Sequence, residues 1–150
     1  MASSVGSEKL FSKLAMSSVD ADADYTTAAA VASNWLDMRD YESYAAIVNP
    51  QALTGAGLTL VEIVAADDTS GTNITQVKTS GAVVGDAIAD YVALECTAQE
   101  IAQLSAAGGL SLRYVNVRIT ADNAADEFRV FNVRGHPRHA TTALTATNIT

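Results

Sequence analysis

The clearest alternation of apolar and polar positions along this chain lies in the stretch LRYVNVRIT, residues 112–120. Val115, Val117 and Ile119 fall on one face of an extended chain, and polar or amphipathic side chains fall on the other. A period of two residues predicts a strand. The turn formers of ADNAAD and a second extended run, Glu127–Gly135, follow directly, so the two runs together predict a β-hairpin.

Other extended runs precede this pair. Leu58–Asp67 alternates in the same way and predicts a strand that is buried largely on one side. The remaining runs are a short extended piece at Trp35–Met38 and strands at Tyr41–Val48, Ile74–Lys78 and Asp90–Cys96. The Asn-Pro dipeptide that follows Val48 is expected to end its strand.

One segment follows a helical pattern instead. Thr97 and Glu100 have the spacing of a capping box, in which the threonine hydroxyl and the glutamate carboxylate each bind an unpaired amide at a helix start. Ile101 and Leu104 supply the apolar stripe, and the Gly-Gly pair at 108–109 is suited to a left-handed cap. The pattern predicts a helix of about two to three turns, which is too short to define a helical domain.

The composition favours one thin-layered domain. A chain of 150 residues with 49% hydrophobic content can bury roughly 70% of its unfolded surface without disulfides or metal. Alanine, valine and threonine dominate and aromatic residues reach only 6%, which suits a sandwich or jelly roll. We therefore expect an all-β protein with a β-sandwich domain over residues 35–135, one short helix, and extended arms over residues 1–34 and 136–150.

The charge restricts the partners. A net charge of −8 and a pI near 4.5 argue against nucleic acid, because phosphate contacts need a concentrated basic surface. The charge is uneven, since residues 1–110 carry −10 and residues 111–150 carry +2. No apolar run has the length of a signal-peptide core or a membrane span, so a membrane partner is not expected.

No residue pattern predicts catalytic chemistry. Cys96 is the one cysteine and is expected to be a small buried apolar side chain. His136 and His139 are close in sequence but have no further ligand nearby, so a metal site is not expected. A nucleophile would have to recruit its histidine base from the predicted C-terminal arm. We expect a protein that is not an enzyme and that has no cofactor, no metal and no catalytic residues.

The arginines of the C-terminal third allow two interpretations. They are Arg113, Arg118, Arg129, Arg134 and Arg138. In the first, they lie on solvated strand faces and form cross-strand pairs with neighbours such as Asp126 or Glu127, each contributing a few tenths of a kcal/mol. In the second, they form a subunit contact, because a guanidinium binds carboxylates bidentately and stacks on tyrosine.

The order of the runs carries a resemblance. WLDMRDYESYAAIV, LVEIVAADDTSGTNITQVK, DYVALECTAQEI, LRYVNVRIT and DEFRVFNVRG follow one another over residues 35–135. This order, with its Asp-rich loop after the second strand and its capped segment before RYVNVR, resembles small structural proteins of tailed bacteriophages. These are encoded among the head genes and described as capsid decoration or cement proteins.

The resemblance implies a location and a set of contacts. It implies a β-sandwich, often of jelly-roll type, that forms oligomers, commonly homotrimers, and clamps neighbouring subunits of the major capsid protein. The acidic charge favours the capsid exterior over contact with packaged DNA, after synthesis in the cytoplasm of the bacterial host. Leu10, Phe11 and Leu14 are the expected anchor of the N-terminal arm, with the alternative that they cover their own subunit. Four of the arginines are expected at subunit or capsid contacts: Arg113, Arg118, Arg129 and Arg134.

The sequence also fits two other functions. A head-to-tail connector or tail protein is also a small β-rich domain with ordering arms. A host-binding or carbohydrate-binding module is a further alternative that β-sandwiches support. Against the latter stands the shortage of aromatic platforms, since Trp35 and five tyrosines are the main supply and Trp35 is expected in the core.

Overall fold

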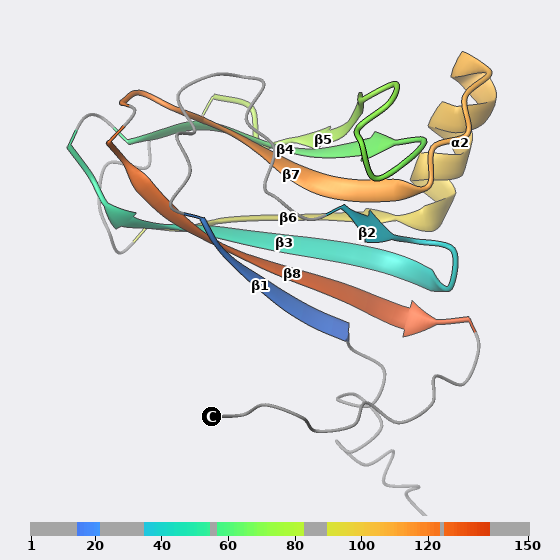
Figure 1. Cartoon of the computed structure of the whole chain (residues 1–150), viewed down its shortest axis with the longest axis horizontal. Helices are drawn as coiled ribbons and strands as arrows, with labels where there is room; N and C mark the ends of the chain where they lie inside the picture. The colour runs from blue at the N-terminus through green and yellow to red at the C-terminus, as the bar shows by residue number, and fades with distance from the viewer. Residues whose placement is uncertain (1–14, 22–34, 55–56, 83–89, 124, 139–150) are drawn as a thin grey trace, which may run out of the picture.

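Two antiparallel four-stranded sheets stack into a sandwich in the computed structural model (Figure 1), which describes residues 15–21, 35–54, 57–82, 90–123 and 125–138. The described strands are β1 (Ala15–Ala21), β2 (Leu36–Asp37), β3 (Tyr41–Ala52), β4 (Leu58–Ala66), β5 (Thr75–Thr79), β6 (Val92–Thr97), β7 (Tyr114–Ala121) and β8 (Glu127–Pro137). The expected all-β fold is confirmed.

The strand order is that of a jelly roll. One sheet has the order β1-β8-β3-β6 and the other β2-β7-β4-β5. First and last strands are therefore paired, as are second and seventh, third and sixth, and fourth and fifth. This is the pairing that results when one long antiparallel ribbon is rolled into two sheets, and it is the arrangement of eight-stranded jelly rolls.

The core between the sheets is built from the inward faces predicted by alternation. Val115, Val117 and Ile119 of β7 are fully buried in it, together with Val61 and Ile63 of β4. The side chains are small and branched, so many of them interdigitate in the thin layer between the sheets.

The outer face of β4 is buried as well. Glu62, Val64 and Ala66 alternate with the core residues of the strand and are nevertheless inaccessible. The expectation of a strand buried largely on one side is therefore wrong. Alternation alone cannot show whether the second face of a sheet is covered.

The predicted hairpin of the two arginine-containing strands is also wrong. β7 and β8 are consecutive but lie in different sheets, and the connection between them crosses from one layer to the other. Buried Asp126 fastens this connection, because its Oδ1 accepts hydrogen bonds from Thr54 N at 2.6 Å and Thr54 Oγ1 at 3.1 Å. A short connection is compatible both with a hairpin and with a crossing between the two sheets. Each strand pairs within the sheet that lets its apolar face pack into the core.

The structure shifts three expected boundaries. β3 continues through Pro50 to Ala52, still paired with β8. Its pairing with β6 ends at Val48, so Pro50 lies where that side of β3 is an unpaired edge. Proline lacks an amide hydrogen and is tolerated at such an edge. β1 belongs to the first sheet although the segment was expected to be part of an arm. β8 extends to Pro137, two residues into the expected C-terminal arm.

The predicted helix is α2 (Ala98–Gly108), and it lies across one end of the sandwich (Figure 1). Both halves of the capping box are present, since Glu100 N donates to Thr97 Oγ1 and Thr97 N donates to a carboxylate oxygen of Glu100. Gly109 ends the helix in the left-handed conformation, with φ 62°. The side chain of Ile101 is buried in the core. The caps at the two ends of the helix and this one buried contact explain why α2 forms and where it packs.

Candidate functional site

Arginines gather at the end of the sandwich that α2 covers. The β2–β3 turn, the segment before β7 and the last residues of β8 meet there, and each brings at least one arginine (Figure 1). We call this surface the arginine end; its residues are Arg39, Arg113, Arg134 and Arg138.

Asp37 organises the arginine end. Its carboxylate accepts a bidentate pair from Arg113, with Nε donating to Oδ1 at 2.7 Å and Nη2 donating to Oδ2, and it also accepts the backbone amide of Arg39 at 2.9 Å. The hydrogen bonds from Arg113 are the main reason that the pKa of Asp37 lies below its usual value. Arg134 Nη1 donates to the Asp37 carbonyl at 2.9 Å, so two arginines from distant strands meet on one aspartate.

Tyrosine rings support two of these guanidinium groups. The Arg134 guanidinium lies 4.4 Å from the centre of the Tyr41 ring, and that of Arg113 lies 5.1 Å from the Tyr114 ring. Both distances are within the range of a cation–π interaction. Arg39 and Arg138 make no ion pair with any described residue, so their charges remain available at the surface.

A hollow of about 170 Å³ opens at the same end. Its floor is apolar and its remaining lining is cationic. The apolar lining comes from Met38, Ala98, Ile101, Ala102 and Leu112, and the cationic lining from Arg39, Arg113 and Arg138. A group that combines an apolar body with a negative or electron-rich edge would complement this surface.

Arg118 lies apart from the arginine end. It stands directly opposite Glu62 in the β4–β7 register, and its Nε donates to Glu62 Oε2 at 2.6 Å. The Glu62 side chain is 6% exposed and that of Arg118 is 24% exposed. This arginine therefore neutralises a buried carboxylate within its own subunit.

The other predicted contact residues are scattered. Arg129 is exposed on β8 and stands opposite Asn49 of β3, near the far end of the sandwich. The structure thus brings together Arg113 and Arg134 and separates them from Arg118 and Arg129. The predicted arm anchors Leu10, Phe11 and Leu14 lie outside the described residues. Arg113 and Arg118 form ion pairs with Asp37 and Glu62, whereas the sequence suggested neighbours such as Asp126 or Glu127.

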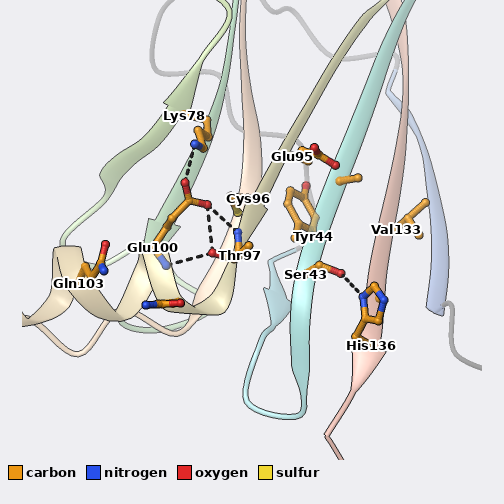
Figure 2. A pocket seen from close by; sticks show the side chains of 13 residues that line it. Ser43, Tyr44, Lys78, Glu95, Cys96, Thr97, Glu100, Gln103, Val133 and His136 are labelled. Atoms are coloured by element: carbon orange, nitrogen blue, oxygen red, sulfur yellow. Dashed lines mark hydrogen bonds and ion pairs between the residues drawn. The ribbon is translucent and has the colours of Figure 1, made fainter.

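A second, larger depression of about 700 Å³ lies beside the start of α2 (Figure 2). Ser43 Oγ and His136 Nδ1 are 3.1 Å apart on one side of it. On the other side Lys78 Nζ pairs with Glu100 Oε1 at 2.5 Å, which raises the pKa of the lysine and lowers that of the glutamate. Glu95 adds a further carboxylate to the lining.

Serine and histidine do meet in this depression because β8 is longer than expected. A serine beside a histidine is one component of a nucleophile–base pair, which also uses a third group to orient the base. Among the described residues, no group makes a hydrogen bond to the second ring nitrogen of His136. The nearby thiol of Cys96 is buried as expected, and burial raises its pKa to about 12.

The Asp-rich loop between β4 and β5 is held by its own hydrogen bonds. Asp68 Oδ1 accepts the amides of Ser70 at 2.8 Å and Thr72 at 3.1 Å, while its Oδ2 accepts the Thr72 hydroxyl at 2.7 Å. These bonds, the Thr72 hydroxyl first, lower the pKa of Asp68. Within the described ranges, no three His, Cys, Asp or Glu side chains are grouped so that they could hold a metal ion.

Trp35 was expected in the core, but it does not belong to the core cluster. It is half-buried, and an added Cβ on Gly71 would lie 3.2 Å from its Cζ2, so the ring packs on the β4–β5 loop.

The described part of the chain contains no helix long and apolar enough to cross a membrane. No family model, no curated protein and no solved structure matches this chain.

Proposed function

We propose that this chain is a structural protein of a tailed-bacteriophage virion, and specifically a decoration or cement protein on the outer surface of the mature capsid. The observation that supports it best is the arginine end of an otherwise acidic jelly roll. Jelly rolls serve in viral capsids, although the fold alone does not determine a function. The sequence resemblance over residues 35–135 supplies the link to phage heads.

Both flanking segments begin beside this surface. Ala15, where β1 starts, is opposite Arg134 in the β1–β8 register, and Arg138 follows the last residue of β8. Segments 1–14 and 139–150 therefore join the sandwich at the arginine end. A neighbour bound there would meet the guanidinium groups beside the two points at which these segments join the sandwich.

The mechanism is mechanical. A protein that binds the mature capsid lattice and not its precursor stabilises the mature lattice by its own binding free energy, about 2.7 kcal/mol per site at a concentration one hundred times the dissociation constant. Exposed arginine and tyrosine suit such a contact, because both residue types are enriched at protein interfaces.

The test compares particles assembled with and without this chain. Particles that lack it should lose integrity at a lower temperature than complete particles and should also break sooner as the salt is lowered. Complete particles should hold hundreds of copies. A matched control restores the chain with Arg39→Glu and Arg138→Glu, which should bind fewer copies. Equal resistance of both kinds of particle to heat and low salt would refute the proposal.

A head-to-tail connector is the second candidate, and one observation favours it. Asp122 and Glu127 are exposed at the end opposite the arginine end, so the two ends differ in charge, and unlike surfaces that bind each other generate rings. A connector would be present in about six or twelve copies per particle, so quantitative mass spectrometry of purified particles separates the two functions. A carbohydrate-binding role would use the polar depression beside α2 and is tested by a glycan array.

A further inference from the structure

The end of the sandwich opposite the arginine end is acidic and carries an exposed aromatic ring. Tyr91, just before β6, is 68% exposed. Asp90 precedes it, and its carbonyl accepts a hydrogen bond from Asn49 at 2.7 Å. Asp122 and Glu127 are exposed where β7 leads to β8 at this same end, and exposed Arg129 lies there as well, so carboxylates outnumber the described cations. We call this surface the acidic end.

The hollow of the arginine end complements Tyr91 in size. An apolar cavity of about 150 Å³ accepts a benzene ring, and the hollow measures about 170 Å³. Met38 and Leu112 supply apolar contacts for the ring. Arg39 and Arg138 supply cations that suit both an aromatic face and neighbouring carboxylates.

One copy cannot make this contact with itself. β3 begins at Tyr41 beside the arginine end, and seven residues later Val48 pairs with Val92, next to Tyr91. Seven residues of strand span roughly 23 Å. The ring and the hollow thus lie at opposite ends of a rigid sheet, and only a second molecule can bring them together.

We propose that copies of this chain associate head to tail, with Tyr91 of one copy seated in the hollow of the next. The acidic end of one copy then meets the cationic lining of the hollow, which includes Arg39 and Arg138, of the next. This names the partner surface for the homo-oligomer of the proposed function, on which it rests. The contact is heterologous, so it closes into a ring when the rotation between copies permits.

Sedimentation of the full-length chain over a range of concentrations and salt provides the first test. The unaltered chain should form a discrete oligomer that weakens as salt rises, because exposed charges are screened. Tyr91→Ser should weaken association roughly 30-fold, which is the effect of losing one strong interface residue. Ile74→Ser is the matched control, since Ile74 is also exposed, at 42%, but neither lines the hollow nor lies at the acidic end. It should leave association unchanged.

Mixing two variants tests the polarity of the contact. The Arg39→Glu/Arg138→Glu chain has a damaged arginine end and an intact Tyr91, whereas the Tyr91→Ser chain has the reverse. Each should be monomeric alone, and the mixture should form a one-to-one dimer that grows no further. Circular dichroism of each variant establishes that it is folded.

The outcomes separate this inference from the proposed function. A monomeric wild-type chain, or oligomers unaffected by either variant, would overturn the head-to-tail contact. A chain that is monomeric in solution but still binds capsids would refute the inference and leave the proposed function standing. An oligomer of the expected polarity that never binds capsids would do the opposite.

Discussion

The outer face of the β2-β7-β4-β5 sheet and the arginine end each hold a carboxylate bound by a guanidinium, but water reaches them to different degrees. At the sheet face the Glu62 side chain is 6% exposed, whereas at the arginine end the side chains of Arg113 and Asp37 are 31% and 36% exposed. A buried charge is strongly destabilising once its ion-pair partner is removed, whereas water can replace the partner of an exposed charge at little cost. The buried pair of Arg118 with Glu62 therefore contributes to the stability of the fold. The pair of Arg113 with Asp37 is partly hydrated, so its guanidinium can also contact another molecule.

The largest effect should come from breaking the buried pair. Arg118→Met leaves the Glu62 carboxylate buried without its cation, which we expect to lower the free energy of unfolding by about 3 kcal/mol. Urea unfolding followed by circular dichroism measures it. The double variant Glu62→Leu/Arg118→Met should recover most of the loss, because an apolar pair of similar size carries no desolvation cost. A single variant as stable as the unaltered chain would remove the distinction between the two regions.

A smaller effect is expected at Asp37. Arg113→Gln should lower the free energy of unfolding at pH 7 by less than Arg118→Met does, since the pair is bidentate but partly hydrated. The pKa of Asp37 is lowered in the folded chain, so this contribution is present above the ordinary carboxyl pKa and is lost as the pH falls through the folded value. The difference in stability between the two chains should therefore begin to shrink below about pH 4 and disappear once the pH is below the lowered pKa of Asp37. A gap of constant size across that range would contradict the assignment.

The smallest effect on folding is expected at Arg39. Its guanidinium makes no ion pair with a described residue, so Arg39→Gln should change the free energy of unfolding by less than about 0.5 kcal/mol. The same variant should measurably weaken self-association in sedimentation. A loss of stability comparable to that of Arg118→Met would show that the arginine end is built for folding after all.

Local rules in the sequence predicted the parts of the fold that depend on neighbouring residues. Thr97, Glu100 and Gly109 define the helix because capping involves groups within one turn. Alternation likewise identified the inward residues of β7. The topology of β7 and β8 depends instead on which sheet covers each apolar face, and a short turn carries no information about that.

The candidate site was predicted only in part, for a related reason. The concentration of arginines in the last forty residues was visible, but their partners follow from strand register. Asp37 lies 76 residues before Arg113, and Glu62 lies 56 residues before Arg118. The apolar hollow combines the β2–β3 turn, α2 and the residues around Leu112, which no local pattern links. No residue near Arg39 in the sequence indicated that it would line this hollow.

The pairing of β8 with both β1 and β3 also sets the order in which this chain can fold during synthesis. Before Glu127 has emerged from the ribosome, the strands β2, β7, β4 and β5 have already emerged, so that sheet has every partner it needs. At the same moment β1 has no described partner and β3 has only β6. One sheet is thus able to form on the growing chain, whereas the other waits for β8, whose register with β1 joins residues more than one hundred positions apart. Closing so long a loop is slow, and until then the edges of β1 and β3 are exposed to pairing with other chains.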